Sequence, residues 1–556
     1  MSPGKGDLKT VVVPLQEQMA LRSRSGLLLL LAAVSVVLLI ACVNIANLLL
    51  ARSVVRIKEM TVRVALGAGR SRIVRQLMVE NFTLALLGGI AAVAVAYISL
   101  RLILAMSPAD VPRLDEVSLD GRVLLFTCAI SIACGVLIGL VPAWRAASTD
   151  LQGSLKGRGD ADAHAAATRL RSTLVVCEIA LSAACVMAAA LLFQSFASLI
   201  NADKGFDTER LLTVEVNLGS THYQELERRA SFFEGVADDI RQLRGVTTVA
   251  VSTQLPLTGT GAMSALSIES GSVPPMERPR ADVRCVSPGY FEAIGLPLRS
   301  GRSFEQGDRD RLVAVLSEDL AKRAWPGQDS IGRRFHLGVN PSAAVYEVIG
   351  TVSDIRGTAL DQPLTPTAYV PFPQRSFSNS TVLVKTSGDT LNLAAPIRQT
   401  IRAHDPEVPI GRFRTMNDVV DQSVAPRRFQ LQLVSLFALL TALLSALGIF
   451  GVMSYSVAQR RGEMGIRLAL GTPPREILGR VIREALRIAI VGLLVATPLA
   501  WLAGRFLQSF LYSVTPYDPV AAAAVVAIVI STAVIAAAGP GLRASRVDPM
   551  VALRCD

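Results

Sequence analysis

Long apolar stretches alternate with charged loops over much of the chain. Seven of these stretches approach or exceed the ~20 residues that an α-helix needs to cross a bilayer. They cover roughly residues 27–51, 82–105, 123–143, 173–199, 431–456, 485–505 and 519–539. The pattern therefore predicts a membrane α-helical protein with about seven transmembrane helices.

The interval between the fourth and fifth stretches has a different pattern, in which short β-branched runs alternate with amphipathic segments. Strands are predicted at 211–216, 246–252, 281–286, 312–316, 344–352, 366–371 and 380–385, and helices at 223–243, 317–324, 389–403 and 415–425. A break at 257–279, rich in Gly, Ser and Pro, would separate two subdomains. We expect an inserted soluble α+β domain over 200–428.

One charged segment between spans occurs twice. Residues 59–80 read EMTVRVALGAGRSRIVRQLMVE, and residues 463–484 read EMGIRLALGTPPREILGRVIRE, in a register that needs no gaps. The exit from the third span is also repeated, as PAWRA at 142–146 and PGLRA at 540–544. Such repeats indicate two copies of a three-span unit, at about 27–156 and 431–554.

These patterns predict the domain organisation. We expect a short extracytoplasmic tail (1–26), a first three-helix unit (27–156) and a flexible cytoplasmic linker (157–171). A lone transmembrane helix (172–199), the soluble domain (200–428) and a second three-helix unit (429–556) follow.

The net charge of +11 lies in the membrane part of the chain, because the segment 201–428 is close to neutral. Loops 52–81 and 457–484 are rich in arginine, whereas loops 106–121 and 506–518 together contain only Arg113. By the positive-inside rule the arginine-rich loops face the cytoplasm. The soluble domain is then outside and the C-terminus inside, and membrane orientation explains the charge better than a nucleic-acid partner does.

Three polar residues lie within the predicted spans. Asn44 and Asn47 have helical spacing near the cytoplasmic end of the first span, where they could form a polar relay, although hydrogen bonds between helices or closeness to the interface are favoured. Glu178 is a functional candidate because it is ionisable. The alternative is that it lies a turn or two from the start of its helix, where the positive helix N-terminus stabilises a carboxylate.

No motif for catalysis or cofactor binding stands out. The chain contains no GxxxxGK[ST] phosphate loop, its four histidines share no metal-ligand spacing, and Cys285 is the lone cysteine of the soluble domain. We therefore expect no enzyme, no cofactor and no metal site in this chain, so that nucleotide-driven work would come from another chain.

The repeated EMxxRxALG segments, the PxxRA exits and the soluble domain between a lone span and a three-span set resemble the permease subunits of type VII ABC systems. This is the family of the macrolide exporter MacB, the cell-division protein FtsX and the lipoprotein-releasing permeases, and the duplication resembles its duplicated orphan permeases. The family layout is one span, an external domain and three spans. The first copy lacks the first two parts, which favours an N-terminal truncation over a genuinely shortened form.

The resemblance implies where a partner binds. In the family, a cytoplasmic coupling helix of each unit sits in a groove of a separate ABC ATPase subunit. Carried over, it assigns Glu59, Arg63 and Gly67, with Glu463, Arg467 and Gly471, to two contact patches in which charged contacts are made and a short helix ends at glycine. The alternative is a loop that rests among lipid headgroups. Pro473-Pro474 predicts a kinked or weaker second patch.

The leading hypothesis is the permease subunit of an efflux or mechanotransmission system in the bacterial cytoplasmic membrane. Its cargo would be antimicrobial, peptide or lipid-like, and the resemblance leaves open a periplasmic adaptor or other envelope partner. Two alternatives are a membrane scaffold that regulates cell-wall hydrolases and an orphan surface sensor or adhesin. The kinked second patch would favour the orphan.

Overall fold

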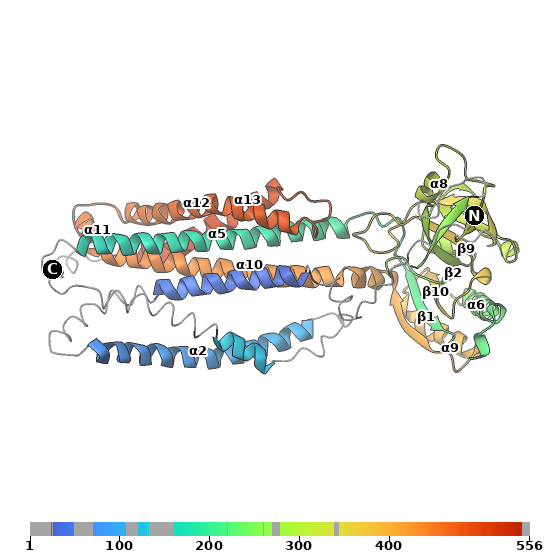
Figure 1. The fold of residues 1–556 in the computed structure, drawn as a ribbon, viewed down its shortest axis with the longest axis horizontal. Coiled ribbons are helices and arrows are strands. Elements are labelled where there is room, and N and C mark those ends of the chain that lie inside the picture. The colour runs from blue at the N-terminus through green and yellow to red at the C-terminus, as the bar shows by residue number, and fades with distance from the viewer. Residues whose placement is uncertain are drawn as a thin grey trace, which may run out of the picture. The chain divides into compact units, whose positions relative to one another are not determined.

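The computed structural model describes residues 24, 26–48, 70–106, 120–129, 132, 160–219, 221–259, 261–268, 278–338 and 344–546 (Figure 1). The chain divides into two compact units. One, here called the helical unit, consists of residues 1–198 and 427–556, and the other, the mixed unit, of residues 199–426.

Six helices in the described part of the chain are long and apolar enough to cross a membrane. They are or lie within Gly26–Leu48, α2 (Arg70–Met106), α5 (Asp160–Ile200), α10 (Met416–Gln459), α12 (Pro474–Leu507) and α13 (Pro519–Ser545). Residues 121–129 are also helical, and the rest of the stretch expected at 123–143 lies almost wholly outside the described residues. A short helix, α11 (Arg461–Ala469), joins α10 to α12.

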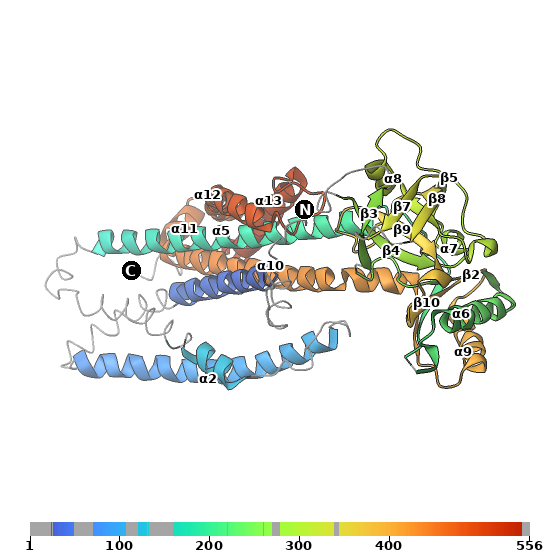
Figure 2. The ribbon, with the colours of Figure 1, turned by 45° about the vertical axis from the view of Figure 1, so that its right-hand side comes forward.

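Small residues bring the helices of the helical unit close together. Helices α5, α10, α12 and α13 run alongside one another (Figure 2) and share a core of Val, Ile and Ala side chains. Ala485 and Ala489 of α12 and Ala533 and Ala537 of α13 are buried there. At Gly492, an added Cβ would lie 2.6 Å from Ile179 Cγ2 of α5, so only glycine permits this approach. Close backbone contact is what holds helices together where no water can be expelled.

The expected flexible linker is wrong over most of its length. Helix α5 begins at Asp160, so residues 160–171 are helical rather than flexible. The stretch DADAHAAAT at 160–168 contains five alanines, which have the highest helix propensity of all residues, and a helix that is already formed extends at little cost.

The mixed unit combines eleven strands with short helices. The strands are β1 (Leu211–Asn217), β2 (Val246–Ser252), β3 (Ala262–Ile268), β4 (Arg280–Val286), β5 (Leu298–Gly301), β6 (Val313–Ser317), β7 (Arg334–Leu337), β8 (Val345–Val352), β9 (Thr367–Pro371), β10 (Asn379–Thr386) and β11 (Ile410–Thr415). The α-helices are α6 (Leu226–Arg241), α7 (Tyr290–Ala293), α8 (Glu318–Ala324) and α9 (Ala394–His404), with 3₁₀ turns η2 (Thr221–Tyr223), η3 (Gln306–Asp308), η4 (Phe372–Gln374) and η5 (Leu391–Leu393). The α+β prediction for this unit is confirmed.

All strands belong to one sheet, which has two parts. Strands β11, β1, β10 and β2 form an antiparallel set, and β4, β3, β7, β8, β6 and β9 close into a ring because β9 also pairs with β4. The two parts are joined by a single residue pair, Ser252 with Val286. The expected break at 257–279 is wrong for residues 262–268, since β3 lies there and pairs with β4 and β7.

Helices α6 and α9 cover one face of the antiparallel set. Phe233, Val236 and Ile240 of α6 and Ile397 and Ile401 of α9 are fully buried against strand residues. These apolar positions recur at helical spacing, which is why the sequence of α6 could be recognised as amphipathic.

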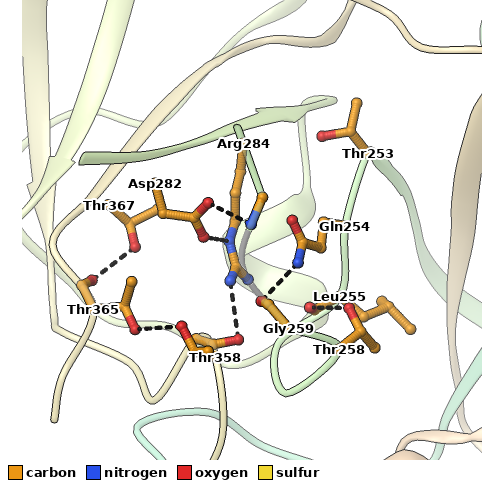
Figure 3. A network of polar contacts seen from close by, with 12 residues as sticks. Thr253, Gln254, Leu255, Thr258, Gly259, Asp282, Arg284, Thr358, Thr365 and Thr367 are labelled. Carbon is orange, nitrogen blue, oxygen red and sulfur yellow. Dashed lines mark hydrogen bonds and ion pairs between the residues drawn. The ribbon is translucent and has the colours of Figure 1, made fainter. Parts of the chain in front are cut away.

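A buried ion pair lies beside the single link between the two parts (Figure 3). Arg284 Nε donates to Asp282 Oδ2 at 2.9 Å, and both side chains are inaccessible to solvent. Arg284 Nη2 also donates to the Gly357 carbonyl, and the Gly261 N–H donates to Asp282 Oδ1. Through these hydrogen bonds the ion pair connects β4 to the loops that follow β2 and β8.

We predict that Asp282→Asn strongly destabilises the mixed unit, because it leaves the Arg284 guanidinium buried without a counter-charge. Losing one partner of a buried pair costs about 3–5 kcal/mol, which for a unit of this size lowers the thermal midpoint by about 6 °C or more. The measurement is thermal unfolding of the purified full chain. Asp238→Asn, which opens the exposed Arg241–Asp238 pair, serves as control and should change stability by less than about 1 kcal/mol. Equal midpoints for the two variants would contradict the prediction.

A second prediction concerns acid stability. Arg302 contacts buried Asp308 with two hydrogen bonds, at 2.6 and 2.8 Å, and these lower the pKa of Asp308 below its usual value near 4. A lowered folded-state pKa gives stability that is complete above the ordinary value and is lost as the pH falls through the lowered one. Thermal midpoints measured from neutral pH downward should thus fall less steeply in Asp308→Asn than in the natural chain. An unchanged acid slope would refute this role, and Asp238→Asn should keep the natural slope.

Candidate functional site

Helix α11, in the loop between spans α10 and α12, contains the start of the second copy of the repeated segment. Its Met464 and Gly465 are buried, and Met464 belongs to the core of the helical unit together with residues of α12 and α13. Glu463, Ile466 and Leu470 face outward and are exposed. A nine-residue helix has little stability of its own, so this burial is what holds α11 in place.

The two charged residues assigned to the second patch pair with each other. Arg467 Nη2 lies 2.5 Å from Glu463 Oε1 across one helical turn, and both side chains remain substantially exposed. Such a pair stabilises a helix by only about 0.3–0.5 kcal/mol. Both charges therefore remain available to an approaching surface.

Gly471 ends the helix through its backbone conformation. Its φ of +89° is in the left-handed region that favours glycine. The Gly471 N–H donates to the Leu468 carbonyl and the Thr472 N–H to the Arg467 carbonyl, the two bonds of a Schellman motif. The sharp end of α11 thus depends on Gly471.

The prolines after this glycine do not kink α11, so the expected kink is wrong. The helix has already ended at Ala469, and Pro473 and Pro474 occupy the N-cap and first position of α12. Proline is favoured at the first position because its missing N–H would have no helical partner there. The prolines define the start of α12.

Sequence reasoning missed two apolar residues on the outer face of α11. Leu470 is 82% exposed and Ile466 49% exposed, one helical turn apart. The signal was available, since the first copy has Val62 and Leu66 at the same positions. Neighbouring exposed apolar side chains can mark a contact with a protein or with a membrane. Glu59, Arg63 and Gly67 of the first patch lie outside the described residues.

A shallow depression between α11 and the first turns of α12 is lined by charges of both signs. Arg460 Nη1 lies 3.4 Å from Glu484 Oε2, and Arg480 and Glu476 pair more loosely along α12. The Arg460–Glu484 contact connects the start of α11 to α12, and Met464, Ile477 and Val481 form the apolar part of the lining. Among the described residues, no group of three or more His, Cys, Asp and Glu could hold a metal ion.

Two of the three polar span residues come together. Asn44 Nδ2 donates to Glu178 Oε1 at 2.7 Å and to the Leu444 carbonyl of α10 at 2.9 Å, so three helices meet here. Asn47 is buried, and its side-chain polar atoms have no hydrogen-bond partner among the residues that the structure describes. A relay from Asn44 through Asn47 is therefore not formed by hydrogen bonds in this structure.

The expected stabilisation of Glu178 by a helix N-terminus is wrong. Because α5 begins at Asp160, the carboxyl lies about 18 residues, or roughly 27 Å, from the helix start. The helix dipole acts only within the first turn. Glu178 is instead fully buried among neighbouring helices, and Asn44 is its hydrogen-bond partner.

Comparison with protein families matches both parts of this architecture. The family described as FtsX-like permease C-terminal matches residues 31–151 and again 435–549, which are the two copies of the three-span unit. The family described as MacB-like periplasmic core domain matches residues 172–400. The mixed unit is thus similar to a domain that lies outside the cytoplasmic membrane.

Curated relatives show the same similarity over part of their length. A macrolide export ATP-binding/permease protein MacB from Azoarcus sp. (strain BH72) is 28% identical over 288 residues, which cover 49% of this chain and 42% of that protein. A protein named "Probable syringafactin export ATP-binding/permease protein SyfD", from Pseudomonas syringae pv. tomato, is 28% identical over 293 residues, covering 50% and 42%. The chain spans about two-fifths of the length of these relatives.

Among solved structures, the periplasmic region of MacB from Actinobacillus actinomycetemcomitans matches with a TM-score of 0.29 at 16% identity, covering 40% of this chain and 97% of that one. Apolar spanning helices, a duplicated FtsX-like unit and a MacB-like periplasmic domain together describe a membrane protein with an extracytoplasmic domain. The chain carries two FtsX-like permease units and a MacB-like periplasmic core domain, the two parts that characterise ABC transporter permeases of the MacB/FtsX type.

Proposed function

We propose that this chain is the permease subunit of an ABC-type efflux or mechanotransmission system. A separate subunit hydrolyses ATP, and the permease couples that hydrolysis to movement of its extracytoplasmic domain. The observation that carries the proposal is helix α11. It is anchored through Met464, presents Ile466 and Leu470 outward beside the Glu463–Arg467 pair, and has a sequence counterpart in the first copy.

The positive-inside rule supports a cytoplasmic location for α11. Five arginines lie between the end of α10 and the first turns of α12, namely Arg460, Arg461, Arg467, Arg475 and Arg480. With α11 inside, the chain topology puts the C-terminus inside as well. An ATPase is cytoplasmic because its nucleotide is, so this location is the one that coupling requires.

The contacts of α11 are suited to transmitting a displacement. Glu484 of α12 accepts hydrogen bonds from Ser456 and Arg460, which bracket the end of α10. At Gly541 of α13 an added Cβ would lie 2.6 Å from Leu478 of α12. A force on α11 therefore acts on three spans together. Of these, α10 is one continuous helix from Met416 to Gln459.

The repeated span exit has a role in this picture. Pro540 and Ala544 are buried near the end of α13, on the same turns as Gly541. Residues 540–544, the second copy of the exit, therefore pack the end of α13 against the start of α12. The matching exit of the first copy, at 142–146, lies outside the described residues.

The names of two relatives support the proposed cargo class. One is named for the export of macrolides and another for the export of syringafactin. We propose an antimicrobial, peptide or lipid-like cargo handled by the extracytoplasmic domain. The orphan alternative loses its support, because it depended on a kink in α11 that the prolines do not produce.

We predict that Leu470→Asp weakens binding of the ATPase subunit at least about tenfold, since burying a leucine contributes about 1.5–3 kcal/mol. The measurement is co-purification of a nucleotide-binding subunit from native membranes in mild detergent, followed by an ATPase assay of the complex. Leu391→Asp is the matched control, because Leu391 is an exposed leucine of the extracytoplasmic domain. Unchanged recovery of the ATPase with Leu470→Asp would refute the docking role of α11.

A charge exchange separates recognition from helix stability. Glu463→Arg puts two arginines one turn apart, and we expect it to reduce ATPase recovery. The double variant Glu463→Arg/Arg467→Glu restores the intrahelical pair with the charges exchanged. If the partner contacts these two charges in their natural order, ATPase recovery stays low for the double variant in the same co-purification assay. Full recovery would show that the pair only stabilises the helix.

A further inference from the structure

The first copy contacts the second inside the helical unit, and this contact involves the carboxyl of Glu178. Helix Gly26–Leu48 belongs to the first copy, whereas α5 and α10 precede and open the second. Asn44 is the residue at which the first copy donates to both of these helices. Ile40, one turn away on the same helix, is fully buried.

The two copies contribute different residues at equivalent positions of this contact. The offset that places Glu59 on Glu463 also places Asn44 on Gly448. A Cβ at Gly448 would lie 2.3 Å from Glu178 Oε2 and 2.9 Å from its Cδ. One copy therefore provides a hydrogen-bond donor for the carboxyl, and the other provides the space that the carboxyl occupies.

The surroundings of Glu178 favour a neutral carboxyl. Its side chain is fully buried, and in the described part of the chain Asn44 is its one hydrogen-bond donor and Oε2 has no hydrogen-bond partner. An ionised carboxylate can accept about four hydrogen bonds, and leaving these unfilled in an apolar interior costs several kcal/mol. A protonated carboxyl carries no net charge, so burying it costs far less free energy.

No cation in the described elements around Glu178 forms an ion pair with it. Helix Gly26–Leu48 presents the neutral Asn44, α10 buries Thr441 and Ser445 around the Leu444 carbonyl, and α12 meets α5 at Gly492. The core residues that α13 supplies are apolar. On α5 itself, Arg171 is two turns away, about 10 Å along the helix, with its guanidinium 4.0 Å from the Tyr455 ring centre.

We propose that Glu178 is a proton-binding site at the contact between the two copies. A carboxylate at this position takes one proton from the solvent and becomes a neutral acid when the helices close around Asn44 and Gly448. It returns that proton when the helices separate and water reaches it. The proposal goes beyond the coupling function and does not depend on an ATPase. Closing the two copies is then linked to pH and is favoured at lower pH.

Infrared difference spectroscopy tests the protonation directly. The full chain in lipid nanodiscs is compared with Glu178→Gln at neutral pH. We expect the natural chain to show the C=O stretching band of a protonated carboxylic acid, and the variant to lack it. A solvated glutamate, with an ordinary pKa of about 4.3, would be ionised under these conditions. Absence of the band in the natural chain would overturn the proposal.

Asp518→Asn is the matched control for this spectrum. Asp518 caps α13, where the Ala521 N–H and other donors lower the pKa of its carboxyl, so it is ionised at neutral pH. Asparagine is also a good N-cap residue, so the helix should be retained. Asp518→Asn should keep the protonated-acid band. Loss of the band in this control would show that the band comes from Asp518 and not from Glu178.

Thermal unfolding against pH gives a second readout. The midpoint of the natural chain should fall as the pH rises, and it should fall less steeply in Glu178→Gln, because glutamine resembles the protonated acid and cannot ionise. Gly448→Ala should lower the midpoint and weaken the infrared band. Gly451→Ala should do neither, since a Cβ there meets no atom within 4 Å. An alkaline slope kept by Glu178→Gln, or equal behaviour of the two glycine variants, would refute the proposal.

Discussion

A polar group inside a bilayer has no water to bind, and the helical unit is built around that constraint. Backbone groups are satisfied within the helices, so packing depends on small residues such as Gly492, which lets Ile179 approach closely. Asn44 of the first copy and Glu178 of the lone span α5 satisfy part of each other's hydrogen-bonding capacity. Asn44 also donates to the Leu444 carbonyl of the second copy.

The same bundle explains why a nine-residue helix can serve as a contact surface. Helix α11 is too short to be stable alone, and the burial of Met464 and Gly465 fixes its orientation. The left-handed Gly471 then stops the helix immediately after Leu470, leaving that side chain at the tip. Because the spans determine the position of α11, a partner outside the bilayer that binds α11 responds to the arrangement of the spans.

Features set by local sequence could be predicted, and those set by distant partners could not. The spans, most strands of the mixed unit and the glycine stop of α11 follow from hydrophobic period and backbone preference. Strand β3 was missed because its glycine- and serine-rich surroundings resemble a loop, and pairing with β4 and β7 stabilises it. The Asn44–Glu178 contact joins residues that are 134 positions apart, so no local sequence pattern predicts it.

The difference between Asn44 and Gly448 also bears on how the duplicated gene can evolve. Two halves that both carried glycine would leave the carboxyl without its donor, and two that both carried asparagine would fill the space that the carboxyl occupies. Neither half can therefore be replaced by a second copy of the other. Gene conversion that made the two positions identical would therefore disrupt this contact, and so would a pair of identical subunits.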